Sequence, residues 1–380
     1  MRHVINAVFA RGGSSNALIF HERDLPADKT LWDPLFRHVM GSPDPYGRQL
    51  DGMGGGISSL SKIVIVAPSA RDDADVDYTF VQVGVRDGVI DYGMFCGNMA
   101  ASVGPFAVDE GVVPVADGLA VIRVYNTNTD KIYHARFMVA GGLAVESGTF
   151  TIPGVSGSGA RIDLEFINPG GACTAGLLPT GRACDRLTVP DVGAIDVSCV
   201  DATNPVAFVR GADLGVDATA LPHQLDTDRG LAAKTEAIRR HAAVAMGMAP
   251  NADAALQSNP KIGVVAPPAD LPALDGTVIP AKDMDVIIKM VSMENFHRAI
   301  PLSSSMCAAA AAAVPGTVVH AISTNHAPLR IGTASGVVES RAMVSHRANS
   351  YHADSAATSR TQRRLFQGQL PVPAEWLPKR

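Results

Sequence analysis

An internal repeat constrains the fold of this chain more than any other feature of its sequence. The segment Ser61–Pro68, a lysine followed by an apolar run, returns as Pro260–Pro267. Five matched positions occur in the same order in both halves, with offsets of 199 to 208 residues: Met40 and Met246, Lys62 and Lys261, Asp75 and Asp283, Cys96 and Ser303, and Arg123 and Arg330. Ordered matches at nearly constant spacing indicate two copies of one structural unit.

A glycine pair is also repeated, but at a different offset. Gly12-Gly13 matches Gly170-Gly171, which lies 158 residues further along the chain. Since Met40 and Met246 are 206 residues apart, we expect the second copy to contain about 48 additional residues between its glycine turn and Met246. The stretch 184–222, which is rich in turn-forming residues, is predicted to belong to them.

Each copy is predicted to combine short strands with one buried helix. Runs of β-forming residues are separated by Gly, Asp and Asn turns. Helices are predicted over about 97–108 and about 304–314, where small residues dominate. Because small residues let other segments approach from every side, we expect strands to wrap around both helices. The serines at 303–305 are favourable N-cap residues, so the second helix is expected to start there, and by symmetry the first at 96–98.

The length of 380 residues suits two domains. The repeat places the first domain at 1–158 and the second at 159–345. The remaining residues, 346–380, are predicted to form a C-terminal helical tail that packs back on the first domain. The fold class is therefore α+β, with two pseudo-symmetric domains.

Composition and motifs exclude several classes of protein. The net charge of −5 and the pI near 6.1 provide no broad basic surface for nucleic acid. The most apolar stretch, 306–314, is too short for a membrane span and the N-terminal segment lacks a signal-peptide pattern, so we expect a cytoplasmic protein. Five cysteines without a CxxC pair, and the absence of an HExxH pattern, predict reduced thiols, no metal centre and no cofactor. No glycine-rich nucleotide motif is present, and a homodimer is the default expectation for assembly.

The two helix starts are the best candidates for a binding site. A helix N-terminus carries unpaired N–H groups and a partial positive charge, so two of them facing one cleft between the domains would bind a substrate with two or three carboxylates. Glycine turns expose backbone amides to the same ligand, although such turns also occur without one. The candidate substrate-binding residues are Gly13, Ser14, Ser15, Asn16, Gly54, Gly55, Ser61, Gly97, Asn98, Ser303, Ser304 and Ser305.

Two side chains are candidates for proton transfer. Cys96 precedes a helix, where a thiolate is stabilised and exchanges protons; the alternative is a small buried side chain without a chemical role. Lys62 follows a Gly-Ser loop and begins an apolar strand, so burial would favour a neutral amine that acts as a general base. The alternative for Lys62 is an exposed lysine at the end of a strand. Its repeat partner, Lys261, lacks the preceding Gly-Ser loop.

A long series of ordered motifs resembles the PrpF family and covers nearly the whole chain. The motifs are Arg11–Ser15, Gly41–Asp44, Gln49–Gly55, Ser61-Lys62, Asp75–Tyr78, Cys96–Asn98, Val103–Ala107, Leu177–Gly181, Asn204-Pro205, Pro260–Ile262 and Arg363–Leu365. The resemblance implies the diaminopimelate-epimerase fold, in which each of two pseudo-symmetric domains wraps a curled, mostly antiparallel sheet around a central helix. It also implies isomerases that move a proton in small unsaturated polycarboxylates, namely 2-methylaconitate, methylitaconate and 4-oxalomesaconate.

The resemblance also assigns roles to single residues. Lys62 matches the catalytic base of the family pattern, and Cys96 matches the thiol beside it. The family's usual His-Pro-Ser-Gly turn reads Thr333–Gly336 here, which adds Ser335 and Gly336 to the substrate-binding candidates. The usual Thr-Ser-Lys-Gly reads Ser14–Ala17, without the lysine, and the usual Asp-Pro reads Asn168-Pro169, so the resemblance leaves the substrate open.

These observations predict an isomerase that uses Lys62 to abstract an allylic proton from a methylaconitate-, aconitate-, methylitaconate- or oxalomesaconate-like acid. Two alternatives remain open, namely a cofactor-independent amino-acid racemase or epimerase and a non-catalytic carboxylate-binding protein. Related epimerases have a cysteine at both helix starts, whereas Ser303 stands at the second start here, which disfavours the racemase.

Overall fold

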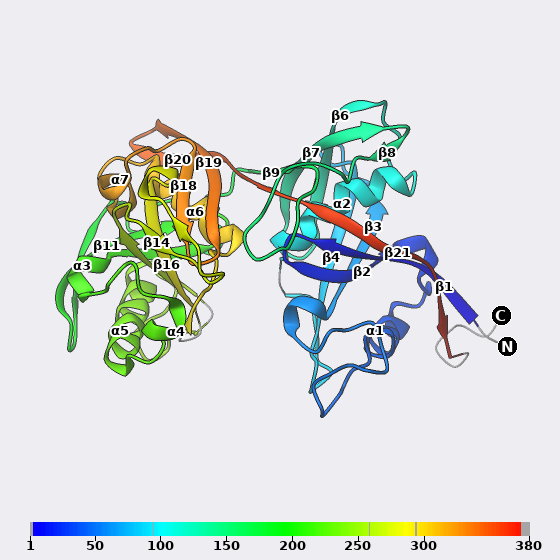
Figure 1. The fold of residues 1–380 in the computed structure, drawn as a ribbon, viewed down its shortest axis with the longest axis horizontal. Helices are drawn as coiled ribbons and strands as arrows, with labels where there is room; N and C mark the ends of the chain where they lie inside the picture. The colour runs from blue at the N-terminus through cyan, green and yellow to red at the C-terminus, as the bar shows by residue number, and fades with distance from the viewer. Residues whose placement is uncertain (1–2, 94, 258, 293–294, 374–380) are drawn as a thin grey trace. The chain divides into compact units, whose positions relative to one another are not determined.

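The computed structural model describes residues 3–93, 95–257, 259–292 and 295–373, and they form two compact units (Figure 1). We call Met1–Leu164 together with Ser359–Arg380 unit 1, and Glu165–Thr358 unit 2. The chain passes from unit 1 to unit 2 within β9 (Ile162–Ile167) and returns within β20 (Ser350–Arg360). The predicted boundaries at 158 and 345 lie before β9 and β20. Because the chain returns to unit 1 within β20, unit 1 consists of two separate segments of the sequence.

Unit 1 is a curled sheet around one helix. Neighbouring strands pair in the order β21–β1–β2–β3–β4–β6–β7, with the short β5 beside β4 and β8 beside β7. The helix α2 contacts β1, β2, β3, β6, β7 and β8, and its residues Met99–Val108 are all buried. The bounds are β1 (His3–Gly12), β2 (Ser15–His21), α1 (Trp32–Met40), β3 (Lys62–Pro68), β4 (Val76–Val83), β5 (Ile90–Asp91), α2 (Gly97–Asp109), β6 (Gly118–Asn126), β7 (Lys131–Ala140), β8 (Leu143–Ala144) and β21 (Gln362–Val372).

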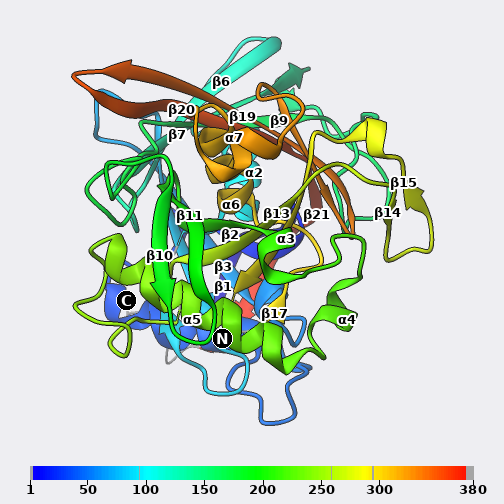
Figure 2. The ribbon, with the colours of Figure 1, turned by 90° about the vertical axis from the view of Figure 1, so that its left-hand side faces the viewer.

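Unit 2 repeats this plan around α6, which lies among strands of its sheet in Figure 2. Its strands pair in the order β10–β11–β12–β13–β16–β18–β19–β20. The bounds are β10 (Asp185–Val189), β11 (Gly193–Asp201), β12 (Pro205–Arg210), α3 (Gly211–Leu214), α4 (Pro222–Leu225), α5 (Arg229–Ala245), β13 (Lys261–Ala266), β14 (Leu271–Pro272), β15 (Val278–Ile279), β16 (Val286–Ser292), β17 (Asn295–Phe296), α6 (Leu302–Ala312), α7 (Val318–Ile322), β18 (Leu329–Thr333) and β19 (Gly336–Arg347).

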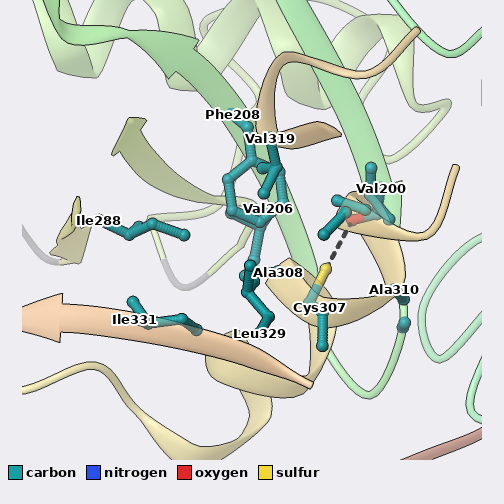
Figure 3. Close-up of a cluster of buried hydrophobic side chains, with 14 of the residues drawn as sticks. Val200, Val206, Phe208, Ile288, Cys307, Ala308, Ala310, Val319, Leu329 and Ile331 are labelled. Atoms are coloured by element: carbon teal, nitrogen blue, oxygen red, sulfur yellow. Dashed lines mark hydrogen bonds between the residues drawn. The ribbon is translucent and has the colours of Figure 1, made fainter. Parts of the chain in front are cut away.

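The core of unit 2 explains why α6 is built from alanines. Ala308–Ala312 are completely buried, and strand side chains such as Phe208, Ile288 and Leu329 pack in the same cluster (Figure 3). Larger side chains on the helix would keep these strands at a distance. The Sγ atom of Cys307 points to the carbonyl oxygen of Val200, and burial raises the pKa of this thiol. Cys307 is therefore a structural residue of the core.

The hydrogen-bonding pattern is the same in both units. In unit 1 the successive pairs from β1 to β7 are antiparallel, parallel, antiparallel, parallel and antiparallel. In unit 2 the pairs from β11 to β19 follow the same sequence of directions. The predicted α+β class and the predicted wrapping of a mostly antiparallel sheet around a small-residue helix are both confirmed.

A repeated ion pair corrects one of the predicted matches. In unit 1 the carboxylate of Asp75 accepts the backbone N–H of Arg123 at 2.7 Å and its guanidinium at 2.7 Å. In unit 2 the same two bonds join Arg330 to Asp285, at 2.8 and 2.7 Å. Asp75 thus corresponds to Asp285, not to Asp283, because β16 is displaced by two residues relative to the sequence match.

The two ion pairs are expected to differ in their contribution to stability. Asp285 is 1% exposed, whereas the side chain of Asp75 is 25% exposed. Asp285→Ala leaves the N–H and the guanidinium of Arg330 without their buried acceptor, so we expect it to lower the free energy of unfolding by about 2–3 kcal/mol. Asp75→Ala is expected to cost about 1 kcal/mol less, since water replaces the lost acceptor there. Urea denaturation of both variants measures the difference, and an equal loss would contradict it.

The match between the two glycine pairs is also wrong. In unit 1 the Gly12-Gly13 turn joins β1 to β2. The corresponding turn of unit 2 joins β11 to β12 and consists of Ala202–Asn204. Thr203 has φ +65° and Gly13 has φ +53°, so both turns need a left-handed residue. Gly171 lies beside that turn and donates its N–H to the carbonyl of Asp201 at 2.9 Å. Because unit 2 has a threonine at the left-handed position, a search for matching glycines does not find this turn.

Two predicted helix features are corrected as well. The N-cap of α6 is Pro301, and the serines 303–305 lie inside its first turn. Counted from the helix start, Cys96 therefore corresponds to Pro301 rather than to Ser303. The tail predicted as helical over 346–380 forms strands as far as Val372, and residues 374–380 lie outside the described residues. The end of this tail is extended because β21 pairs with β1 at ten positions.

Burial of Lys289 on β16 is expected to make stability depend on pH. Lys289 is 6% exposed and donates to the carbonyl of Ala220 at 2.6 Å. Burial lowers its pKa from 10.5 to about 8, against a smaller opposing effect of Asp217. The unfolded chain then binds more protons between these two values, so the free energy of unfolding rises with pH from about 8 to about 10.5, by up to about 3 kcal/mol. Urea titrations across this range measure the rise, and most of it should be absent in Lys289→Met.

Candidate active site

Lys62 is buried at the first position of β3. It is 8% exposed, and its Nζ donates to Oε1 of Gln82 at 2.6 Å. The Nζ also lies 5.1 Å from the centroid of the Phe80 ring. Gln82 is the direct partner of Lys62 in the β3–β4 register. The alternative interpretation of Lys62, an exposed lysine at a strand end, is therefore wrong.

Cys96 is the N-cap residue of α2 and is half-buried. Its carbonyl oxygen accepts the phenol O–H of Tyr78 at 3.1 Å and the N–H of Ala100 at 3.0 Å. Burial raises the pKa of Tyr78 well above its ordinary value, with a further contribution from Cys96, so the phenol remains a donor. Tyr78 also makes an edge contact with Phe95 at 6.0 Å between ring centroids. The start of α2 is thus fixed to β4 by a buried side chain.

Lys62 and the start of α2 contact the same face of β4. Tyr78, Phe80 and Gln82 alternate along the strand and therefore point to the same side of the sheet. Tyr78 contacts Cys96, while Phe80 and Gln82 contact Lys62. Tyr78 and Gln82 are four residues apart, about 14 Å along the strand, and Phe80 lies between them. The sequence analysis identified none of these three residues as part of the site, although Tyr78 lies in the motif Asp75–Tyr78.

The glycine turn of unit 1 packs against the start of α2. A Cβ atom on Gly12 would lie 2.8 Å from the carbonyl oxygen of Asn98, and one on Gly13 would lie 2.4 Å from its Oδ1. Asn98 also donates from Nδ2 to Oγ of Ser14 at 3.2 Å. The predicted group Gly13, Ser14 and Asn98 is therefore brought together, with Gly97 beside it. Ser15 is buried on β2 next to Asn16, which is half-buried.

The second glycine loop does not have the bare amides that we expected. Gly54 donates to the carbonyl of Met40 at 3.3 Å, and Gly55 donates to that of Leu60 at 3.0 Å. The loop closes on itself because Gln49, 1% exposed, accepts the N–H of Gly56 and donates to Oγ of Ser61 at 2.7 Å. The hydroxyl of Ser61 in turn donates to the carbonyl of Val83 at 2.9 Å. Gly54, Gly55 and Ser61 therefore support the segment that leads into Lys62.

The candidates of unit 2 gather in two places. Ser303 accepts at its carbonyl from Oγ1 of Thr203 at 2.8 Å, and Oγ of Ser305 donates to the carbonyl of Leu302 at 2.8 Å. Oγ of Ser304 is buried and has no hydrogen-bond partner among the residues that the structure describes. Ser335, followed by Gly336 at the start of β19, donates from Oγ to the carbonyl of Arg298 at 3.0 Å.

The helix starts offer unpaired donors. The amides of Gly97, Asn98 and Met99 occupy the first turn of α2, and such amides have no acceptor within the helix. Neither α2 nor α6 has a side-chain cap that would occupy these donors. Both helices are long enough to present a partial positive charge at this end. The start of α2 is suited to a carboxylate.

Within the described residues, no set of three or more His, Cys, Asp or Glu side chains is grouped as metal ligands would be. The same residues include no helix with the length and hydropathy of a membrane-spanning segment.

The duplicated unit with a helix inside a curled sheet defines a known class of fold. A hydroxyproline epimerase of Agrobacterium vitis, at 9% identity, superposes with a TM-score of 0.51 over 98% of this chain and 94% of that one. A methylitaconate Δ-isomerase, at 35% identity, superposes with a TM-score of 0.91 over 100% of this chain and 98% of that one. The chain thus has the diaminopimelate-epimerase-like fold.

The chain belongs to the PrpF family. The model of the family, described as PrpF protein, matches residues 2–373. The 2-methyl-aconitate isomerase of Shewanella oneidensis is 34% identical over 97% of both chains. On these relationships the protein is an isomerase, as the motifs predicted.

Proposed function

We propose that the protein is a cofactor-independent isomerase that moves a proton and a double bond in a small unsaturated di- or tricarboxylate. The relatives named above act, by their names, on 2-methylaconitate and methylitaconate. The observation that supports this function best is the buried amine of Lys62, held by an uncharged partner on the strand face that also contacts the start of α2. Aconitate and 4-oxalomesaconate have the same conjugated carboxylate and belong to the same candidate class.

In the proposed reaction, neutral Lys62 removes a proton from a carbon next to the conjugated alkene. The C–H bond breaks, an N–H bond forms, and the electron pair spreads through the double bond onto a carboxylate. The first-turn amides of α2 stabilise that charge as an oxyanion site does. The ammonium of Lys62, or the thiol of Cys96, then returns a proton to another carbon, or to the same carbon after rotation. The result is a shifted double bond or a cis–trans change, with no net gain or loss of atoms.

Proton NMR in deuterated water tests this proposal. The protein is incubated with 2-methylaconitate, aconitate, methylitaconate and 4-oxalomesaconate, and we expect conversion of at least one acid with deuterium entering an allylic carbon. A racemase would instead place deuterium at the α-carbon of an amino acid and depend on a thiol. A carboxylate-binding protein would bind these acids without any exchange, which would contradict the proposal.

A further inference from the structure

Gln82 has a fixed orientation beside Lys62. Its Nε2 donates to the carbonyl of Ser61 at 2.9 Å and to that of Ser58 at 3.0 Å. An amide has a donor end and an acceptor end, so occupying Nε2 in this way forces Oε1 to face the opposite side. Oε1 accepts the 2.6 Å bond from Lys62. Both carbonyls belong to the segment that leads into β3, so the glutamine ties Lys62 to its own loop.

The β4 side chains that contact the amine of Lys62 are uncharged, which suits a general base. Lys62 makes no ion pair among the residues that the structure describes, and its contacts on β4 are the amide of Gln82 and the ring of Phe80. The acidic residue opposite Gln82 in the register is Asp91 on β5, whose carboxylate accepts the N–H of Gly93 at 2.7 Å. The titratable groups further along the same face of β4 are Tyr78 and, at the start of α2, Cys96. A carboxylate in place of Gln82 would favour the ammonium form, whereas a neutral amide does so far less.

We propose that Gln82 is a positioning residue for the isomerisation: it accepts the hydrogen bond that aims the amine of Lys62 while leaving that amine without a counter-charge. This inference rests on the proposed role of Lys62 as the base. Gln82 acts through Lys62 and does not itself exchange a proton with the substrate.

Two substitutions separate the two parts of this role. Gln82→Met keeps the size of the side chain but removes the acceptor, so kcat should fall by up to about 100-fold while KM changes less than about threefold. Gln82→Glu keeps an acceptor for Lys62 and adds a charge, but it also replaces the Nε2 donor that bonds the carbonyls of Ser61 and Ser58 by an oxygen. We therefore expect a lower maximal rate, together with an upward shift of the acid limb of the kcat/KM profile by about one pH unit. At pH values above that limb, Gln82→Glu should recover part of its activity, which a loss of structure would not allow.

The matched control is Gln369→Glu, which adds the same charge at an exposed position of β21 in the same unit and should leave the profile unchanged. A wild-type kcat in Gln82→Met would overturn the positioning role. A loss of activity in Gln82→Glu that is equal at every pH would overturn the role of the uncharged acceptor. Thermal melts of both variants identify any that fail to fold.

A second measurement does not depend on turnover. Folded protein is acetylated briefly with acetic anhydride, and mass spectrometry follows Lys62 and, in the same sample, exposed Lys234. Only a neutral amine is acetylated, so at neutral pH we expect Lys62 to react at least about fivefold more slowly in Gln82→Glu than in wild type, with Lys234 unchanged. Equal rates would overturn the inference. If no acid is isomerised by the wild type, the proposed function fails, while this measurement still decides the effect of Gln82 on the amine.

Discussion

Replacing Lys62 by methionine is expected to lower kcat about 1,000-fold while the protein remains folded. A positioned general base contributes roughly 100- to 10,000-fold to a rate, and methionine has no proton acceptor of that kind. Methionine fills a similar volume at a site that is only 8% exposed, so packing is largely kept. The lost 2.6 Å bond to Gln82 is expected to cost about 1 kcal/mol of stability. The measurements are the conversion rate by NMR and the free energy of unfolding by urea titration.

Two further variants make this result specific. Lys261 starts β13 as Lys62 starts β3, and burial lowers its pKa, so Lys261→Met is the matched substitution in unit 2. We expect it to retain most of the activity. Cys96→Ser should lose less than Lys62→Met, because Lys62 itself can return the proton. If Lys261→Met abolished conversion and Lys62→Met did not, the base would be on the other unit.

Replacing Gly12 by alanine is expected to damage both stability and catalysis. Its Cβ would lie 2.8 Å from the carbonyl oxygen of Asn98 and 3.0 Å from Cα of Met99, and neither backbone atom moves without shifting the first turn of α2. Overpacking of this kind costs about 2 kcal/mol. The displaced amides would no longer face the developing charge, so we expect kcat to fall by up to about 100-fold. Urea denaturation and steady-state kinetics measure the two effects.

The control for Gly12→Ala is Gly176→Ala in unit 2. An added Cβ at Gly176 meets nothing within 4 Å, and this glycine is not in the left-handed region. We expect its stability and kcat to remain close to wild type. A Gly12→Ala protein with unchanged kcat would show that the position of the α2 start is not important for the reaction.

The repeat made the architecture predictable, but not the details that depend on contacts between distant segments. The repeat offset of about 207 residues identified both buried helices, because a stretch of small residues is easily recognised in each copy of the sequence. The match of Asp75 to Asp283 was wrong by two residues, since only strand register shows that Arg330 binds Asp285. The tail was predicted as a helix because its extended form is imposed by β1, a partner about 360 residues away in the sequence.

The candidate site was predictable in part for the same reason. Lys62 and Cys96 were identified from their positions at the start of a strand and of a helix. Gln82 and Phe80 were missed because their importance comes from the β3–β4 register. Gly54 and Gly55 were interpreted as open donors because the sequence gives no sign that Gln49, with φ +52°, folds back to close the loop.

The pairing of β1 with β21 has a consequence for how the protein matures. Gly13 donates its N–H to the carbonyl of Thr361 at 3.0 Å, and the guanidinium of Arg11 donates to the same carbonyl at 3.1 Å. During synthesis on the ribosome, unit 2 is translated completely before Thr361 exists. The turn beside the start of α2 therefore lacks this acceptor until Thr361 has been synthesised. A ribosome-bound intermediate that contains all of unit 2 but ends before Thr361 should have no isomerase activity.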